Sequence, residues 1–213
     1  VQGTGVRQAR YYLALAGDFA CNPEGVVRTA AEQLGSFPVF VKPCSQGSSV
    51  GVAKANNMLE LAEGLTEAFR MDSKVLVEEF IDGHEVECAV LGNEHPQAST
   101  VGEIAPTQEF YTFDAKYKDE SSRLYIPAHI TGEQLETVRQ DALRVYTALG
   151  CRGLSRVDFF VTHDRGEVVF NELNAIPGFT SISMYPKLFD YEGIGYAELL
   201  DRLISLALEE HHG

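Results

Sequence analysis

The sequence predicts an α+β fold, because helical and strand-like segments are mixed without the regular alternation that builds a parallel sheet. Two observations carry this prediction. Apolar side chains recur at helical spacing in well-separated segments, and short apolar runs end at glycine-containing turns that favour antiparallel hairpins. With 213 residues, 45% of them hydrophobic, the chain can bury a sizeable core.

The first half of the chain is expected to combine helices with short buried strands. The expected elements are a helix over 7–16 that ends near Gly17, a strand over 39–42, a helix over 57–71, and strands over 75–80 and 85–91. Apolar residues of the second helix recur three and four positions apart, which predicts one buried face. Asp82-Gly83 lies between the last two strands and predicts that they form a hairpin.

The second half is expected to contain another hairpin between two helices. The expected elements are short strand-like pieces over 100–123, a helix from Thr131 to Gly150, strands over 154–161 and 167–173, and a helix over 196–209. Thr131 and Gln134 have the spacing of a capping box, and Gly150 stands where a C-terminal glycine is expected. The turn at 163–166 would make the two strands antiparallel neighbours.

Composition argues against several classes of function. The net charge of −14 disfavours binding to nucleic acid and to anionic membranes, which both attract basic proteins. No apolar run reaches the length of about 18 residues that spans a bilayer, and the first fifteen residues are not expected to be a signal peptide, because they lack an uninterrupted apolar core. The cysteines are scattered without metal-ligand spacing, so reduced thiols in a cytosolic protein are favoured over a disulfide; they are Cys21, Cys44, Cys88 and Cys151.

The stretch "FNELNAIPGFTSIS", residues 170–183, places polar side chains in a β-prone run. Alternate side chains share a face of a strand, so Glu172 and Asn174 point the same way, as do Arg156 and Asp158 on the partner strand. Three hard oxygen ligands beside one guanidinium suit Mg²⁺ or Mn²⁺ rather than zinc. The alternative is a structural ion pair between Arg156 and Glu172, which leaves Asp158 and Asn174 unexplained.

The stretch "FVKPCSQGSSVGVAK", residues 40–54, follows the first expected strand. Its glycines and hydroxyls could bring backbone N–H groups against phosphate oxygens, and Lys42 could reach the same anion. It matches neither the Walker A nor the Rossmann pattern, and many such loops are only turns.

The stretch "VLVEEFIDGHEVECAV", residues 75–90, offers carboxylates at the ends of two strands. Glu78 or Glu85 could accept hydrogen bonds from ribose hydroxyls, and a main-chain edge could pair with adenine. The alternative is that these groups, Glu79 above all, are solvated charges at the end of a hairpin.

Five segments in this order resemble the ATP-grasp superfamily, specifically the D-alanine–D-alanine ligases and the related vancomycin-resistance ligases. They are "FPVFVKPCSQGSSVG", "VLVEEFIDGHEVECAVLG", "DAKY", "ALGCRGLSRVDFF" and "VVFNELNAIPGFTSISMYP", within residues 37–208. The resemblance implies an ATP-grasp fold, with ATP held between the antiparallel sheets of two subdomains. These are a central subdomain over 1–98 and a C-terminal catalytic subdomain over 99–213.

The resemblance also implies roles for individual residues. The ATP-binding residues are implied to be Lys42, Ser48, Ser49, Glu78, Glu79, Ile81, Glu85 and Lys116, with Glu79 and Ile81 acting through their backbone. The ligands of two Mg²⁺ or Mn²⁺ ions are implied to be Asp158, Glu172 and Asn174. Arg156 and the Gly178 amide are implied to stabilise the tetrahedral intermediate, Ser183 and Met184 to hold the second substrate's carboxylate, and Ser48 and Tyr117 to act from mobile loops.

The implied reaction joins two D-amino acids for peptidoglycan precursors in the cytoplasm. The carboxylate of D-alanine would attack the ATP γ-phosphate, and the amine of D-alanine or D-serine would displace phosphate from the acyl phosphate. Family members carry an N-terminal domain that is expected to be missing here, and a homodimer is expected only of a full-length protein. An alignment places Val6, with Arg7 beside it, where the family has a phosphate-contacting lysine on a helix.

Two other functions stay open at this point. One is a different ATP-grasp carboxylate–amine ligase. The other is a nucleotide-binding fragment that is inactive without the N-terminal domain. Sequence does not separate D-alanine from D-serine as acceptor.

Overall fold

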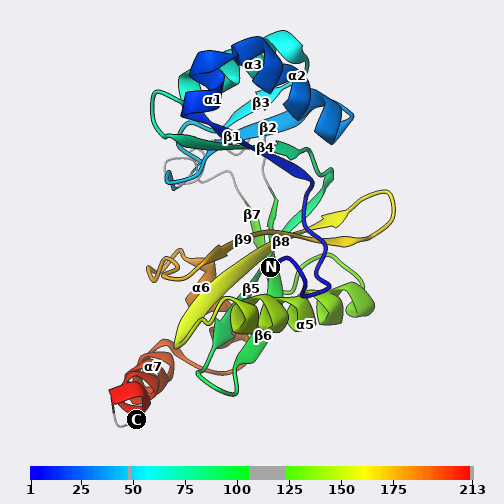
Figure 1. Ribbon diagram of the computed structural model, residues 1–213. Helices are drawn as coiled ribbons and strands as arrows, with labels where there is room; N and C mark the ends of the chain where they lie inside the picture. Colours follow the sequence, from blue (N-terminus) through cyan, green and yellow to red (C-terminus); the bar gives the residue numbers. More distant parts are fainter. Residues whose placement is uncertain (48, 106–122, 212–213) are drawn as a thin grey trace. The chain divides into compact units, whose positions relative to one another are not determined.

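The computed structural model describes residues 1–47, 49–105 and 123–211, and contacts divide them into two compact units. One unit contains residues 9–81 and a four-stranded sheet. The other contains residues 1–8, 82–105 and 123–211 and a five-stranded sheet (Figure 1). Neighbouring strands are antiparallel in both sheets, so the predicted α+β class is confirmed.

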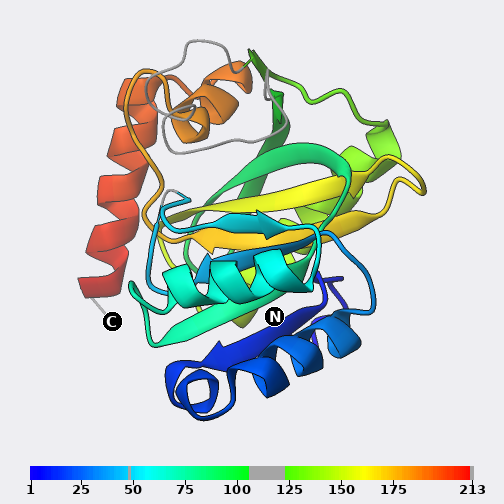
Figure 2. The same ribbon diagram turned by 90° about the horizontal axis from the view of Figure 1, so that it is seen from above.

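The four-stranded sheet has the order β1-β4-β2-β3 and carries its helices on one face (Figure 1). Its strands are β1 (Tyr11–Leu15), β2 (Val39–Pro43), β3 (Ala53–Ala55) and β4 (Lys74–Glu79). Its helices are α1 (Ala16–Cys21), α2 (Pro23–Leu34) and α3 (Met58–Ala68), and α2 and α3 are neighbours (Figure 2). Val39 and Val41 of β2 are fully buried under the helices, so Phe40 and Lys42 point to the other face of this sheet.

Side-chain caps explain where two of these helices begin. The Asn22 side chain accepts a hydrogen bond from the Gly25 N–H, and Pro23 occupies the first turn of α2, where a missing N–H costs nothing. The Asn57 side chain accepts from the backbone N–H groups of Leu59 and Glu60 at the start of α3.

The five-stranded sheet has the order β7-β6-β5-β8-β9. Its strands are β5 (Gly83–Leu91), β6 (Gln97–Ala105), β7 (Arg123–Tyr125), β8 (Leu154–Thr162) and β9 (Val168–Asn174). Its helices are α5 (Gly132–Ala148), α6 (Met184–Tyr191) and α7 (Tyr196–His211). The last helix, α7, contacts α6 and extends away from the sheet (Figures 1 and 2).

Helices α5 and α6 cover opposite faces of this sheet. Val101 of β6 belongs to the core under α5, which contains the fully buried Tyr146. Gly102, the next residue, faces α6, because a Cβ atom added there would lie 2.6 Å from the Met184 sulfur. A glycine at this position therefore allows α6 to approach the sheet closely.

Most elements predicted from the sequence are confirmed. The predicted helices at 57–71, 131–150 and 196–209 correspond to α3, α5 and α7, and the capping box at Thr131 and Gln134 is present. The hairpin around 163–166 is β8–β9. None of the described helices is long and apolar enough to cross a membrane.

Two predictions in the first half of the chain are wrong. Residues 11–15 form β1 instead of a helix, because they pair with Lys74–Glu78 of β4 along their whole length. The strands on either side of Asp82-Gly83 form no hairpin with each other: β4 pairs with β1 and β2, whereas β5 pairs with β6 and β8. The compact units also differ from a division at residue 98, because β5 belongs to the five-stranded sheet and the chain changes unit after Ile81.

Candidate active site

The β8–β9 hairpin brings four polar side chains onto one face of the five-stranded sheet. Arg156 is opposite Asn174 in the register, and Asp158 is opposite Glu172. Val157 is buried in the core under α5, so its neighbours Arg156 and Asp158 point to the opposite face. The four side chains are therefore neighbours, as the alternation along the two strands predicts.

A β-bulge lies directly beside this group. Asp158 pairs with Glu172, but Phe159 pairs with Phe170, so Asn171 is an extra residue in β9. Bulges twist a strand and re-aim its side chains, and they are frequent beside active sites. This bulge separates the polar end of β9 from its apolar beginning.

Arg156 is held by two carboxylates. Its Nε and Nη2 atoms donate to both oxygens of Asp158, at 2.8 and 2.7 Å, and Nε also lies 3.2 Å from Oε2 of Glu87. Burial alone would lower the pKa of Arg156, but the attraction of Asp158, and then of Glu87 and Glu172, raises it above its ordinary value. Arg156 is therefore a permanent cation, and the alternative of a close Arg156–Glu172 ion pair is replaced by pairs with Asp158 and Glu87.

Asn174 links the two carboxylates that were expected to bind metal. Its Nδ2 atom donates to Oδ2 of Asp158 at 3.0 Å and to Oε1 of Glu172 at 3.3 Å. A single neutral N–H donor group thus spans both carboxylates. Turning the amide over would present its oxygen to the same place, as a third oxygen ligand. Among the described residues no three His, Cys, Asp or Glu side chains group as metal ligands, so the donor set is two carboxylates and a carboxamide. This composition fits Mg²⁺, which usually takes one or two carboxylates and completes its shell with water and phosphate.

The segment after β9 folds back on itself at Ser183. The Ser183 hydroxyl accepts from the Thr180 N–H at 3.0 Å, and a Cβ atom added to Gly178 would lie 2.8 Å from the same oxygen. Met184 begins α6, and the residue as a whole is 4% exposed. The Met184 sulfur lies against Gly102, so a polar contact of Met184 would come from its backbone, and N–H groups at a helix start favour a carboxylate.

In the four-stranded unit, Lys42 and Glu78 lie together on the face away from the helices. The Lys42 Nζ atom is 2.6 Å from Oε2 of Glu78. Lys54 lies on the same sheet, with Nζ 4.6 Å from the centre of the Phe80 ring. This face offers cations and aromatic rings, which suit phosphate and a base, respectively. Lys54 ends the quoted glycine-rich stretch, but no role was inferred for it from sequence.

The glycine-rich stretch is anchored at its beginning. The Ser45 N–H and hydroxyl donate to Oδ2 of Asp72 at 2.5 and 2.7 Å. These hydrogen bonds from Ser45, with another from the Lys74 N–H, lower the pKa of Asp72 to about 2. Ser49 has φ of 60°, a conformation that is costly for a non-glycine residue and concentrates at functional loops.

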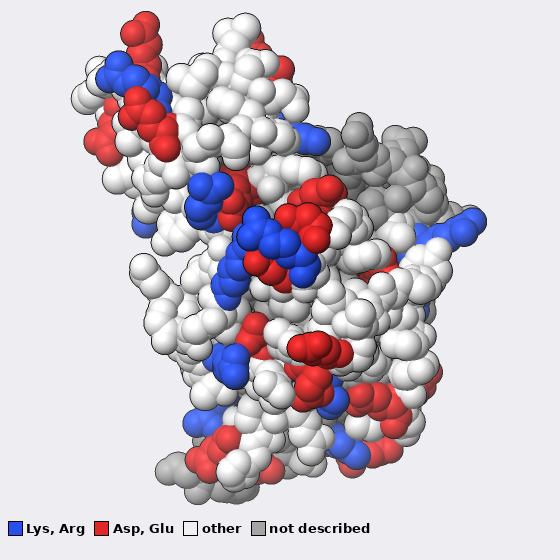
Figure 3. Space-filling model, turned by 90° about the vertical axis from the view of Figure 1, so that its right-hand side faces the viewer, with Lys and Arg blue, Asp and Glu red and all other residues white. Residues whose placement is uncertain are grey.

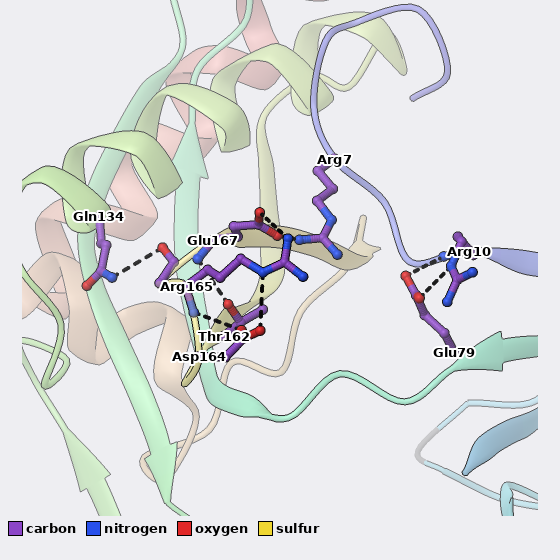
Figure 4. A network of polar contacts seen from close by, with 9 residues as sticks. Arg7, Arg10, Glu79, Gln134, Thr162, Asp164, Arg165 and Glu167 are labelled. Carbon is purple, nitrogen blue, oxygen red and sulfur yellow. Dashed lines mark hydrogen bonds and ion pairs between the residues drawn. The ribbon is translucent and has the colours of Figure 1, made fainter. Parts of the chain in front are cut away.

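Two arginines near the N-terminus are held by glutamates within their own units (Figure 4). Arg10 donates to both oxygens of Glu79, at 2.9 Å from its N–H and 2.7 Å from Nε, so Glu79 is not simply a solvated charge. Arg7 forms an ion pair with Glu167 beside the β8–β9 turn. Val6 is 7% exposed in the core of the five-stranded unit and lies on no helix, so the alignment that matched it to a helical lysine is wrong.

The remaining predicted residues are placed as follows. Ser48, Lys116 and Tyr117 lie outside the described residues. Ile81 is half-buried and follows β4 in the four-stranded unit, whereas Glu85 is half-buried in β5 of the five-stranded unit.

The buried carboxylates in strands β5 and β6, Glu87 and Glu103, were not predicted from the sequence. Glu87 is 3% exposed and contacts Arg156. Glu103 is 5% exposed on the α5 face, and its oxygens lie 2.7 Å from Nδ1 of His84 and 2.9 Å from Nδ1 of His129. Burial opposes its ionisation, but hydrogen bonds from the His129 N–H and both imidazoles lower the pKa of Glu103 overall. Glu85 and Glu87 are two residues apart in β5, so the alternation of side chains along a strand places them on the same face. The same reasoning that was applied to β8 and β9 could therefore have identified Glu87.

Comparison with known proteins agrees with this arrangement. A family model described as "D-ala D-ala ligase C-terminus" matches residues 1–205. The chain belongs to the D-alanine–D-alanine ligase family. It is 51% identical over 208 residues to a D-alanine–D-alanine ligase of Acetivibrio thermocellus, covering 98% of this chain and 55% of that protein. It is 54% identical over 192 residues to one of Chlorobium luteolum, covering 90% and 53%.

Two solved structures in this family superpose on most of the chain. The D-Ala:D-Ser ligase VanG from Enterococcus faecalis has a TM-score of 0.84 and 39% identity, covering 95% of this chain and 57% of that one. The D-alanine–D-alanine ligase from Coxiella burnetii has a TM-score of 0.81 and 35% identity, covering 98% and 54%. The predicted ATP-grasp fold is confirmed, and the chain spans about half the length of the D-alanine–D-alanine ligases it matches.

Proposed function

We propose that this member of the D-alanine–D-alanine ligase family joins D-alanine to a second D-amino acid at the expense of ATP, for peptidoglycan precursors in the cytoplasm. The observation that carries the proposal is the register of β8 and β9, which sets Arg156, Asp158, Glu172 and Asn174 side by side. The reaction forms an acyl phosphate from the first carboxylate, and the amine of the second amino acid then displaces phosphate. Both steps build negative charge on oxygen.

The five-stranded unit supplies the groups that meet this charge. Asp158, Glu172 and Asn174 would hold two Mg²⁺ or Mn²⁺ ions, which neutralise phosphate charge when bound. Arg156 and the Gly178 N–H would donate to the oxygens of the tetrahedral intermediate. Ser183 and the backbone of Met184 would hold the carboxylate of the second amino acid, since the Met184 side chain is buried.

The four-stranded unit supplies the groups for the nucleotide. Lys42, with the backbone and hydroxyls of Ser48 and Ser49, would contact phosphates. Glu78 would bind the nucleoside, with Glu79 and Ile81 acting through their backbone. From outside this unit, Glu85 would accept from ribose. The side chain of Glu79 is already engaged by Arg10, which supports a backbone role for this residue.

Two further roles follow from the family pattern. Lys116 would contact ATP, and Tyr117 would act with Ser48 beside the first substrate. A homodimer is proposed only for a full-length enzyme.

The second amino acid is D-alanine or D-serine. The D-alanine–D-alanine ligases that match the chain favour D-alanine, and the name of one structural neighbour, a D-Ala:D-Ser ligase with 39% identity, favours D-serine as a second candidate. The other candidates are a different carboxylate–amine ligase of this fold and a nucleotide-binding fragment without activity of its own.

Phosphate release with ATP, Mg²⁺ and single D-amino acids tests the proposal. We expect release that needs D-alanine and rises when the preferred acceptor is added, with the dipeptide as product. The assay should be run on this chain and, if the gene encodes further residues, on its whole product. Release without any D-amino acid, or only with L-amino acids, would contradict the proposal. Activity restricted to the longer product would identify the present chain as an incomplete catalytic part.

A further inference from the structure

Glu87 lies in β5, inside the five-stranded sheet and on the same face as Arg156. It is opposite Gly102 of β6 on one side and Asp158 of β8 on the other. Its side chain is 4% exposed, and Oε2 lies 3.2 Å from Nε of Arg156. No catalytic or metal-binding role is assigned to Glu87 in the proposed reaction.

The register places three carboxylates in one row across the sheet. Glu87 is opposite Asp158, and Asp158 is opposite Glu172. Like charges directly opposite each other destabilise a sheet, and a buried carboxylate is costly unless it is paired. An apolar side chain would fill the position of Glu87 more cheaply, since its neighbour Ala89 is also buried. The presence of a charged residue at position 87 therefore indicates a functional role that an apolar side chain could not fill.

Arg156 occupies the next row, between Ala89 and Asn174, and contacts two of the three carboxylates. Asp158 takes both Nε and Nη2, whereas Glu87 contacts only the Nε side. Asp158 is also one of the proposed metal ligands. If Asp158 were the sole partner of Arg156, a bound cation would compete with the guanidinium for the same oxygens.

We propose that Glu87 is a positioning residue, which holds the Nε side of Arg156 so that the guanidinium keeps its place when Asp158 binds a divalent cation. The inference rests on the proposed function, in which Arg156 stabilises the intermediate. With both carboxylates present, Arg156 keeps its contact with Glu87 while Asp158 coordinates the metal ion. Glu87 acts through Arg156 and touches no substrate.

The substitution Glu87→Gln tests this role, because it preserves the size of the side chain and removes its charge. We expect kcat to fall about 10–100-fold, the usual effect of removing a partner that orients a catalytic group. The KM for ATP should change less than kcat, because the contact of Glu87 that carries this role is with Arg156, which acts on the intermediate and not on the nucleotide. The Mg²⁺ concentration for half-maximal activity should rise, and calorimetry with Mn²⁺ and ADP should show weaker metal binding.

Glu103→Gln is the matched control. It removes the charge of another buried carboxylate in the same sheet, but on the α5 face and away from Arg156. We expect it to lower thermal stability without changing the Mg²⁺ dependence. Unchanged kcat and unchanged metal affinity in Glu87→Gln would overturn the inference, as would an equal change of metal affinity in the control.

A double-mutant cycle identifies the residue through which Glu87 acts. If Glu87 works through Arg156, Glu87→Gln should have little further effect in an Arg156→Lys background. Fully additive effects would overturn the inference. If Glu87→Gln does not fold, Glu87→Asp replaces it in the same cycle. If neither this chain nor the whole product of its gene makes dipeptide, the proposed function fails, and Mn²⁺ binding by Glu87→Gln and Glu103→Gln still decides the role of Glu87.

Discussion

Arg156 lies among three carboxylates on one face of the five-stranded sheet, and it contacts only two of them. It contacts Asp158 and Glu87 and leaves Glu172 to the amide of Asn174. Glu172 is also exposed, unlike the other two. An exposed carboxylate without an arginine partner among its described contacts adds little to stability, so its charge is available to a cation.

The substitution Glu172→Gln separates a metal ligand from a structural residue. It keeps the volume and removes the charge, so we expect turnover to fall about 10²–10³-fold, as for other electrostatic stabilisers, or more if metal is lost. The melting temperature should hardly change, because Glu172 is exposed. Asn174→Ala should reduce turnover less, since water can replace a neutral ligand. Near-normal turnover with a lowered melting temperature in Glu172→Gln would remove this residue from the metal site.

At the scale of elements, the beginning of the glycine-rich loop is tied to the turn between α3 and β4. Asp72 in that turn accepts from both the N–H and the hydroxyl of Ser45. The hydrogen bonds are to an ionised carboxylate, which makes them stronger than neutral ones. These hydrogen bonds therefore fix the backbone of the loop at Ser45.

The pH dependence of this anchor follows from the pKa of Asp72, which falls from 3.8 to about 2 because of Ser45 and the Lys74 N–H. A lowered carboxyl pKa in the folded state gives stability that is complete above the ordinary value and is lost as the pH falls toward about 2. Amide exchange at Ser45, corrected for its intrinsic rate, should therefore be slower in the wild type than in Asp72→Asn at pH 5. The difference should close between these two pKa values. Equal exchange at pH 5 would show that the charge of Asp72 does not hold the loop.

The elements also show what sequence patterns can predict here. The β8–β9 hairpin was predictable because its strands are adjacent in the chain and alternation fixes their faces. Residues 11–15 contain good helix formers, yet they form β1, because pairing with β4 across more than fifty intervening residues outweighs local propensity. The Asp82-Gly83 signal failed for the same reason: β4 and β5 have distant partners in different sheets.

The residues of the candidate site also differ in whether local sequence patterns could predict them. Arg156, Asp158, Glu172 and Asn174 follow from a local period of two, which needs no knowledge of the fold. Glu87 comes to Arg156 only because β5 lies beside β8, and these strands are distant in sequence. The bulge at Asn171 is a property of the finished pairing, and the burial of Met184 depends on the glycine opposite it, Gly102.

For the whole molecule, the excess of acidic residues sets the response to salt. The chain has 31 Asp and Glu against 17 Lys and Arg, and on the face in Figure 3 the basic side chains lie among acidic ones and form no separate patch. A net charge of −14 repels itself in a compact state. Salt shortens the range of this repulsion from about 30 Å at 0.01 M to about 8 Å at 0.15 M.

We therefore expect the melting temperature at pH 7 to rise with sodium chloride over this range of concentration. A rise of about 2–4 °C would correspond to about 1 kcal/mol of relieved repulsion for a chain of this size. Salt also screens surface ion pairs such as Arg202–Glu198, which opposes the rise, but exposed pairs contribute little to stability.

The control is the same salt titration near pH 4.8, the isoelectric point, where the net repulsion vanishes. Salt then screens only attractive pairs and should not stabilise the protein. An equal rise at both pH values would show that salt acts through hydration of the surface and not through the charge of the molecule.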